Sequence, residues 1–194
     1  MEKLINKQTK NLKNGKIILY PSDTIWGLGC DATNEIAVSK VFKIKSRPLN
    51  KPLLILVPDL SILKKYIQDF PDEALEIINK KEPTTIIYQN GRNLPQGIIA
   101  PDGSVGIRIP KKGFALELVK NFGKPIVSTS ANISGKKIPK NLMEISNEIL
   151  YQVDDTVNLE KNNFSTKPSN IVKITSEGKL INIRWPKQIW KQEN

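Results

Sequence analysis

Histidine is absent from the 194 residues, and cysteine occurs once, at Cys30. These counts exclude a disulfide framework, a zinc site that uses histidine, and any Ser-His-Asp or Cys-His catalytic arrangement. Any catalysis must therefore use carboxylates, hydroxyls, amides, lysines, arginines or a bound metal. We expect the lone cysteine to be buried and structural, which is typical of a protein in the reducing cytoplasm.

Long apolar runs are also missing. No segment approaches the roughly 18 consecutive apolar residues that a membrane span needs, and residues 1–15 lack the apolar core of a signal peptide. We therefore expect a cytoplasmic protein with no membrane partner, in which residues 1–15 form a short surface helix. Hydrophobic residues make up 39% and charged residues 25% of the chain, a globular balance. No linker divides it, so we expect one domain over residues 1–194.

Basic residues outnumber acidic ones by 30 to 19, which gives a formal net charge of +11. Such an excess favours anionic partners such as nucleotides or nucleic acid, although lysines that only face solvent would give the same count. Because the planar arginine fork suits bidentate recognition of carboxylates and phosphates, the few arginines are candidates for ligand contacts. They are Arg47, Arg92, Arg108 and Arg184.

Apolar patterns predict alternating strands and helices, which is typical of an α/β sheet with helices packed on it. Strands are expected at residues 16–20, 53–57, 84–88, 105–109, 125–127, 171–174 and 180–183, the last two as a hairpin. One helix is expected to have Asn34 as its N-cap and to end before Pro48. Further helices are expected at residues 59–67, 71–81, 114–122 and 142–150.

Three polar clusters stand out. Residues 22–29 combine hydroxyls, a carboxylate and glycines that would let backbone approach a ligand, or they form a polar turn around a core Trp26. Residues 128–135 offer many short-range donors, as a polyphosphate requires, or form a cap-rich loop. The third cluster is a run of cations that either cradles phosphate or only caps a helix and contacts solvent. Its members are Lys40, Lys43, Lys45, Arg47 and Lys51.

Arg108 falls within a predicted strand, where burial would be costly without an anionic partner. A ligand could supply that partner as a carboxylate or phosphate. Alternatively, a side-chain carboxylate of the protein could supply it in a structural salt bridge.

Four blocks of sequence now stand in order between about residues 16 and 184. They read Tyr-Pro-Ser-Asp-Thr-Ile-Trp-Gly-Leu-Gly at 20–29, Lys-Ser-Arg-Pro at 45–48, Val-Gly-Ile-Arg-Ile-Pro at 105–110, and Ser-Thr-Ser-Ala-Asn-Ile-Ser-Gly at 128–135. Together they resemble the YrdC/TsaC family, the threonylcarbamoyl-AMP synthases, in its short, single-domain form.

The resemblance implies a YrdC-like twisted mixed sheet flanked by helices around a concave, positively charged cavity. It also implies a nucleotidyltransferase that converts L-threonine, bicarbonate and ATP into threonylcarbamoyl-AMP, pyrophosphate and water, for the t6A modification at position 37 of ANN-decoding tRNAs. Mg²⁺ would accompany ATP, without a metal site built by the protein. Separate t6A transferase proteins would be the partners.

The same resemblance assigns roles to individual residues. The ATP-binding positions are Lys45, Arg47, Lys51, Ser104, Ser130, Asn132 and Arg184. The threonine-binding positions are Thr24, Arg108, Ser128 and Ser169. The expected catalytic residues, which would act by positioning and charge neutralisation, are Lys45, Arg47, Ser130 and Asn132.

The sequence departs from the family pattern at two places. Leu56 stands where some members carry a histidine, and Trp185-Pro186 follow Arg184 where a glycine is usual. A protein without catalysis, which binds tRNA or double-stranded RNA or acts in ribosome maturation through the same basic cavity, is the alternative. The net charge favours that alternative, but no RNA-binding sequence signature does.

Overall fold

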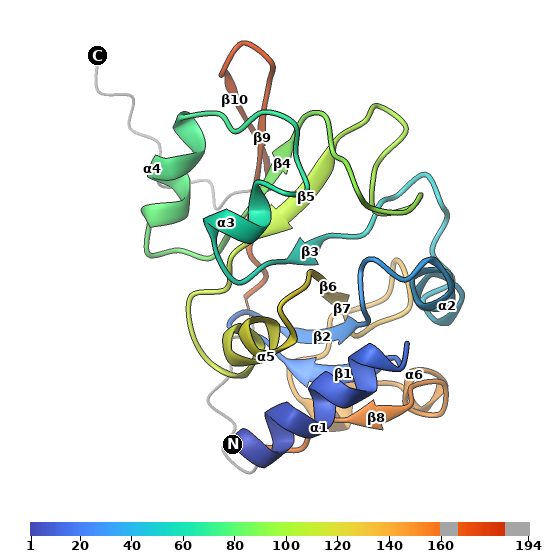
Figure 1. Cartoon of the computed structure of the whole chain (residues 1–194). Helices are drawn as coiled ribbons and strands as arrows, with labels where there is room; N and C mark the ends of the chain where they lie inside the picture. The colour runs from blue at the N-terminus through green and yellow to red at the C-terminus, as the bar shows by residue number, and fades with distance from the viewer. Residues whose placement is uncertain (160–166, 185–194) are drawn as a thin grey trace.

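The computed structural model describes residues 1–159 and 167–184, which form two mixed β-sheets flanked by helices (Figure 1). The expected mixed α/β class is confirmed, but the strands are divided between two sheets. The smaller sheet has the order β7-β2-β1-β8. Its strands are β1 (Ile18–Pro21), β2 (Trp26–Gly29), β7 (Thr129–Ser130) and β8 (Asp155–Thr156).

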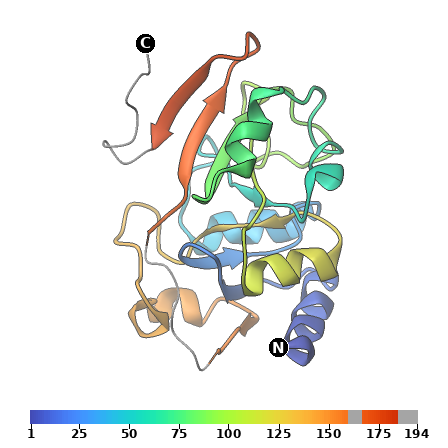
Figure 2. The ribbon, with the colours of Figure 1, turned by 90° about the vertical axis from the view of Figure 1, so that its left-hand side faces the viewer.

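The larger sheet has the order β10-β9-β4-β5-β3-β6 and contains both parallel and antiparallel pairs. Its strands are β3 (Ile55–Leu56), β4 (Thr84–Tyr88), β5 (Val105–Arg108), β6 (Ile126–Val127), β9 (Asn170–Ile174) and β10 (Leu180–Arg184). The predicted hairpin is confirmed as the antiparallel pair β9–β10, which Figure 2 shows at one end of the molecule.

The chain passes from the larger sheet to the smaller one at Ser128. Ile126 in β6 pairs with Leu56 of the larger sheet, whereas Ser130 in β7 pairs with Gly27 of the smaller one. Ser128 itself donates its backbone N–H to the carbonyl of Leu54 at 2.8 Å. This crossing joins the two sheets.

Two apolar cores form on the two faces of β1. Tyr20 packs in a cluster with Leu12 of α1 and Leu118 of α5, and these two helices lie side by side (Figure 2). Leu19 points to the opposite face, where it joins the main core with Val41 of α2. The helices are α1 (Glu2–Lys13), α2 (Glu35–Ile44), α3 (Leu60–Leu63), α4 (Glu73–Asn79), α5 (Phe114–Phe122), α6 (Asn147–Leu150) and the 3₁₀-helix η1 (Leu142–Glu144).

Local capping signals determine where several helices begin and end. Asn34 accepts a hydrogen bond from the N–H of Ala37 and so caps α2, and Gly123 ends α5 in the left-handed conformation. Both were expected from the sequence. Trp26 and Cys30 are buried in the main core, also as expected, and burial raises the pKa of the Cys30 thiol. None of the described helices is both long and apolar enough to span a bilayer.

Two expected helices are interrupted by their surroundings. Residues 142–150 form η1 and α6 instead of one helix. Ile145, which lies between them in the sequence, adopts an extended backbone and buries its side chain in the main core. The helix expected at 59–67 ends at Leu63, since the backbone of Tyr66 and Gln68 pairs instead with residues 90–92. In both places a tertiary contact replaces helical hydrogen bonds.

Residues 22–29 were expected to form a loop, yet the second half of this cluster is β2. A Cβ on Gly29 would lie 2.3 Å from the carbonyl oxygen of Val127 and 2.8 Å from the ring of Tyr20. The hydroxyl of Tyr20 in turn donates to that same carbonyl at 3.1 Å. Gly29 is therefore a glycine because the two sheets approach closely there, and not because a ligand does.

This packing predicts that Gly29→Ala is strongly destabilising. The added methyl group would overlap a backbone oxygen that cannot move away, and we expect a loss of about 3 kcal/mol in the free energy of unfolding, measured with urea. Gly103→Ala is the matched control, because its methyl would contact nothing and only its left-handed backbone would cost about 1 kcal/mol. Equal losses in the two variants would contradict this account.

Candidate functional site

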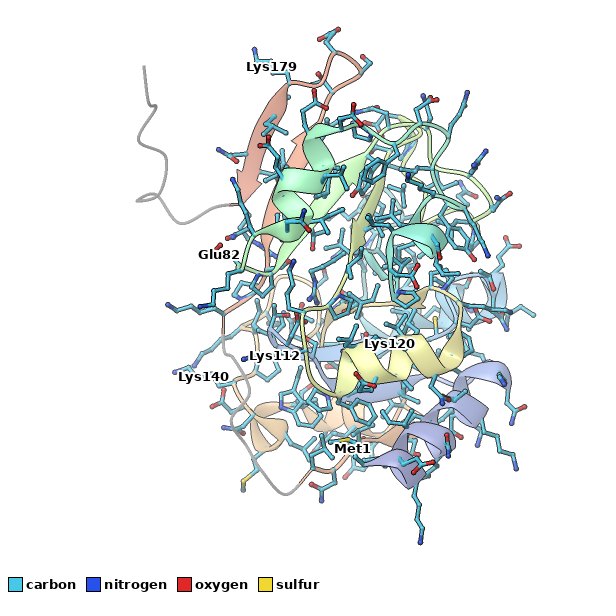
Figure 3. All side chains as sticks on the ribbon, turned by 60° about the vertical axis from the view of Figure 1, so that its left-hand side comes forward. Met1, Glu82, Lys112, Lys120, Lys140 and Lys179 are labelled. Carbon is cyan, nitrogen blue, oxygen red and sulfur yellow. The ribbon has the colours of Figure 1, made fainter. Side chains whose placement is uncertain are left out.

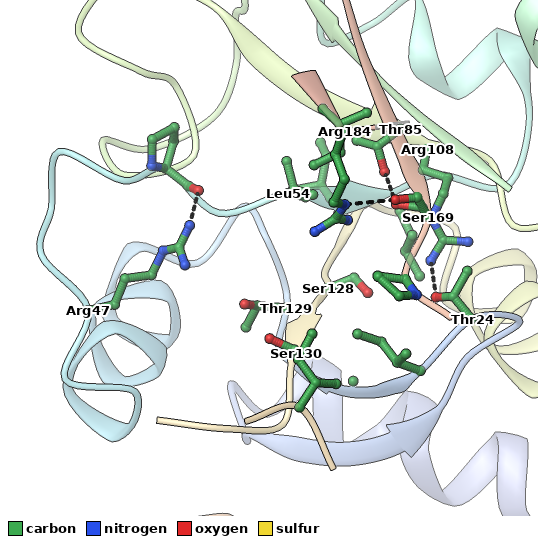
Figure 4. Close-up of a pocket in the computed structure, with 18 residues that line it drawn as sticks. Thr24, Arg47, Leu54, Thr85, Arg108, Ser128, Thr129, Ser130, Ser169 and Arg184 are labelled. Atoms are coloured by element: carbon green, nitrogen blue, oxygen red, sulfur yellow. Dashed lines mark hydrogen bonds between the residues drawn. The ribbon is translucent and has the colours of Figure 1, made fainter. Parts of the chain in front are cut away.

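A cavity of about 210 Å³ lies between the two sheets, as the close-up in Figure 4 shows. Strands of both sheets and the β1–β2 loop supply its walls. Among the described lining residues there are three arginines and no aspartate or glutamate. Most of the predicted site residues line it, namely Thr24, Arg47, Arg108, Ser128, Ser130, Ser169 and Arg184.

Lys45 lies beneath the cavity and does not line it. Its side chain is 1% exposed, and its Nζ donates to the carbonyl oxygens of Ser130 and, at 2.6 Å, Asn132. The carbonyl of Lys45 accepts from the N–H of Ser134 at 2.8 Å. Lys45 therefore clamps the loop that follows β7 from its side chain and its backbone, in contrast to the exposed lysines Lys120, Lys140 and Lys179 (Figure 3).

No carboxylate among the described residues pairs with Lys45. Burial, assisted by the nearby charge of Arg47, lowers the pKa of Lys45 to about 7. The lysine is therefore a buried cation held only by neutral oxygens, next to a cavity that is open to ligands.

The spacing of Lys45 and Arg47 has a local structural cause. Ser46, between them, adopts a left-handed backbone with φ of 47°, which is uncommon for a residue other than glycine. This conformation ends α2 and reverses the chain, so that the N–H of Arg47 bonds the carbonyl of Phe42 at 3.0 Å. Lys45 consequently points into the protein, whereas Arg47 reaches the cavity.

Arg47 is held by backbone oxygens as well. Its Nε donates to the carbonyl of Lys51 at 2.7 Å and its Nη2 to the carbonyl of Pro52 at 3.0 Å, the bond drawn in Figure 4. Partial burial lowers the pKa of Arg47. Two donors are thus used to fix the direction of the guanidinium, while its charge remains unpaired by any described carboxylate.

Arg184, on the opposite wall of the cavity, is also held by a backbone oxygen. Its Nε donates to the carbonyl of Ser169 at 3.0 Å, and the hydroxyl of Ser169 shares a 2.9 Å hydrogen bond with Thr85 (Figure 4). Burial and the neighbouring charge of Arg108 lower the pKa of Arg184. The wall at Pro168 and Ser169 is therefore fixed by β4 on one side and β10 on the other.

Arg108 differs from these cations because it forms an ion pair. Its Nη1 contacts Asp23 Oδ1, and both side chains are almost fully buried. Its Nη2 faces Thr24 Oγ1 at 3.5 Å, and Thr24 is also hydrogen-bonded to Ser22 Oγ at 2.8 Å. The sequence left two alternatives for Arg108, a ligand anion and a structural salt bridge. The structure contains the salt bridge.

Ser128 lies at the sheet crossing, next to Tyr20. Burial raises the pKa of Tyr20, and a hydrogen bond with the Ser128 side chain opposes that shift. The phenol is therefore protonated at neutral pH and supports Ser128.

The remaining predicted residues lie away from the main cavity. Asn132 lines a neighbouring hollow of about 240 Å³, and its Nδ2 donates to the carbonyl of Lys136 at 2.6 Å. Ser104 is occupied by a 2.6 Å hydrogen bond to Asp102, and Lys51 is exposed. Trp185 and Pro186, which depart from the family pattern after Arg184, lie outside the described part of the chain.

Several cavity residues were not singled out from the sequence. Thr85, Leu54 and Ile138 line the cavity, and Asp23 holds Arg108 behind it. Thr85 sits in a strand of apolar and β-branched residues, where nothing in the sequence marks it as polar lining. Asp23 was noted in its cluster, and its position between two hydroxyl residues was the available signal.

No group of three or more Cys, Asp or Glu side chains among residues 1–159 and 167–184 could hold a metal ion. Arg47 and Arg184 have no carboxylate partner in the part of the chain that the structure describes, and such cations suit a polyanion. Arg108 is neutralised by a carboxylate and lies beside several hydroxyls, an arrangement that suits a small polar ligand.

Comparison with known proteins gives a consistent match. The family model Sua5_yciO_yrdC, described as "Telomere recombination", matches residues 10–184. A Methanocaldococcus jannaschii protein, provisionally named a threonylcarbamoyl-AMP synthase, is 41% identical over 185 residues, covering 94% of this chain and 86% of that protein. The threonylcarbamoyl-AMP synthase of Pseudoalteromonas translucida is 32% identical over 174 residues, covering 88% and 92% of the two chains.

A solved structure agrees with this match. Pyrococcus abyssi Sua5 complexed with L-threonine superimposes with a TM-score of 0.83 at 25% identity, over 93% of this chain. The chain spans about half, 53%, of that Sua5 chain.

The buried charge of Lys45 predicts a pH-dependent stability. The pKa of an unfolded lysine is about 10.4, so from pH 7 upward the folded state binds fewer protons at Lys45 than the unfolded state does. Stability from this group therefore rises with pH. Relative to Lys45→Met, the free energy of unfolding of the wild type should rise by about 2–3 kcal/mol between about pH 6.5 and 9 in urea titrations.

The exposed Lys43, on the same helix, supplies the control. Lys43→Met should differ from the wild type by the same amount at both pH values. A constant difference for Lys45→Met as well would refute the account of Lys45 as a buried, unpaired cation.

Proposed function

Because the chain belongs to the Sua5/YciO/YrdC family, we propose that it is a threonylcarbamoyl-AMP synthase. The proposed reaction converts L-threonine, bicarbonate and ATP into threonylcarbamoyl-AMP, pyrophosphate and water, which makes the enzyme a nucleotidyltransferase. Its product would supply the t6A modification of ANN-decoding tRNAs. The observation that carries this proposal is the division of one cavity into a charge-neutralised end and a cationic end.

The charge-neutralised end suits the amino acid. Arg108 offers Nη2 to a carboxylate, and the hydroxyls of Thr24 and Ser128 flank it. Threonine is a zwitterion with no net charge, so it matches an arginine whose own charge is balanced by Asp23. Ser169, held by Thr85 on the facing wall, supplies a further hydroxyl.

The cationic end suits a polyphosphate. Arg47 and Arg184 line the cavity without carboxylate partners among the described residues, and Ser130 adds a hydroxyl beside the clamp of Lys45. Phosphate oxygens would find unneutralised donors here. Lys51, Ser104 and Asn132 stay in the proposal as ATP-side residues by resemblance alone.

The chemistry needs positioning more than a protein base, in agreement with the absence of histidine. The amine of threonine and bicarbonate form a carbamate with loss of water. An oxygen of the carbamate then attacks the α-phosphorus of ATP, and pyrophosphate leaves. The residues Lys45, Arg47, Ser130 and Asn132 would align these groups and neutralise the charge that develops on the leaving pyrophosphate.

Mg²⁺ is proposed as the companion of ATP. Magnesium keeps several waters and binds substrate phosphates readily, and the described lining offers it hydroxyls and no carboxylate. The protein would therefore hold the cation through the polyphosphate. When bound, the cation would neutralise phosphate charge.

Release of pyrophosphate is the test of this proposal. With ATP and Mg²⁺ present, we expect release only when threonine and bicarbonate are both added, and mass spectrometry should detect threonylcarbamoyl-AMP. Lys45→Ala and Asn132→Ala should abolish turnover, whereas Lys43→Ala, an exposed change on the same helix as Lys45, should not. ATP binding without turnover, whatever amino acid is supplied, would refute the proposal.

The same variants separate the enzyme from a protein that only binds RNA. For an enzyme whose product passes to separate t6A transferases, Lys45→Ala and Asn132→Ala should leave the affinity for tRNA or double-stranded RNA nearly unchanged. If there is no turnover to lose and both variants weaken RNA binding, the second candidate, supported by the net charge of +11, is favoured.

A further inference from the structure

Asp23 is a carboxylate that contacts the cavity residue Arg108 without lining the cavity itself. Its side chain is 1% exposed. Oδ1 contacts Arg108 Nη1, and Oδ2 accepts the backbone N–H of Lys111 at 2.9 Å. Both carboxylate oxygens are thus engaged, and Asp23 can act on a ligand only through Arg108.

The pair determines which part of Arg108 a ligand can reach. Nη1 is committed to Asp23, so the guanidinium presents Nη2 beside Thr24 Oγ1 instead of a free two-pronged fork. A carboxylate can still bind at Nη2 with help from a hydroxyl. A polyphosphate loses more there, because its several negative charges meet a guanidinium whose own charge is already balanced.

The other cations around the cavity are arranged differently. Lys45, Arg47 and Arg184 are oriented by carbonyl oxygens, which fix direction without cancelling charge. Arg108 and Arg184 are close enough that the charge of Arg108 affects Arg184. Without Asp23, the cationic field would extend without interruption across the whole cavity.

The remaining charged neighbour of Asp23 is Lys111. Its Nζ donates to the carbonyl of Ile78, and the residue does not line the cavity. Within the described residues, Asp23 therefore balances the charge of Arg108, and Arg184, whose Nε bonds the carbonyl of Ser169, is the neighbouring cation.

We propose that Asp23 is a specificity-determining, positioning residue: by neutralising Arg108 and occupying Nη1, it keeps polyphosphate out of the amino-acid end of the cavity. The proposal rests on the proposed function for the naming of the two ends. It explains how a single cavity with three arginines can hold a zwitterion and a polyanion at the same time without the polyanion occupying both places.

The test uses inorganic pyrophosphate and L-threonine with the full chain, in isothermal titration calorimetry without ATP. In the wild type both ligands should bind together, so that saturating pyrophosphate changes the affinity for threonine less than twofold. In Asp23→Asn, pyrophosphate should occupy the amino-acid end as well. We expect one additional equivalent of bound pyrophosphate, and an apparent threonine affinity at least 10-fold weaker in its presence than in its absence.

Two further variants show whether Asp23 acts through Arg108. The double variant Asp23→Asn with Arg108→Gln removes the exposed charge, and the additional equivalent of pyrophosphate should disappear. Asp31→Asn is the matched control, because Asp31 is a largely buried carboxylate that pairs with Lys124 at 3.3 Å and lies outside the cavity lining. It should behave as the wild type.

A merely structural role for Asp23 gives a different result. If Asp23→Asn weakens threonine binding equally with and without pyrophosphate and binds no additional equivalent, the proposal is overturned. If Asp23→Asn cannot be purified in a folded form, the titrations of the wild type decide. Displacement of threonine by pyrophosphate from the wild type would also overturn the proposal.

The proposed function fails separately. A wild type that binds threonine and pyrophosphate together, but forms no adenylate from ATP and bicarbonate, would refute the synthase reaction and leave the role of Asp23 in ligand selection intact.

Discussion

The crossing of the chain between β6 and β7 is the constraint on which the cavity depends. Because Ile126 pairs in one sheet and Ser130 in the other, the two sheets diverge around Ser128 and leave a space between them. Tyr20 secures the crossing by its hydrogen bond to Val127, and Gly29 allows the close approach. Lys45 then fixes the loop that leaves the crossing, so the fold and the site share the same few contacts.

The sequence predicted those parts of the fold that depend on local signals. The strands at 84–88 and 105–109 and the helices capped by Asn34 and ended by Gly123 follow from apolar periodicity and capping chemistry. It did not predict β2 or the division into two sheets, because strand pairing is set by distant partners. In the site, family resemblance nominated seven of the eighteen described residues that line the cavity. The burial of Lys45 and the pairing of Asp23 with Arg108 depend on tertiary contacts that no spacing encodes.

The chain shows how a site without histidine can be built from charge placement alone. Backbone carbonyls orient Arg47 and Arg184 without cancelling their charge, and a carboxylate orients Arg108 while cancelling its charge. The acceptor type thus sets the local potential, and the direction of each side chain is fixed in both cases. Preorganisation of this kind lowers the reorganisation needed when charge develops on a substrate.

The walls of the cavity also have a consequence for biosynthesis. Thr24 belongs to the first hairpin, whereas Ser169 and Arg184 belong to the last one, so the lining draws on residues from nearly the whole chain. Contacts of such large sequence separation form late and slowly. A nascent chain still attached to the ribosome can build α1, β1 and α2, but it cannot complete a ligand site until residue 184 has emerged. The full set of lining residues is therefore present only once the chain has been synthesised as far as Arg184.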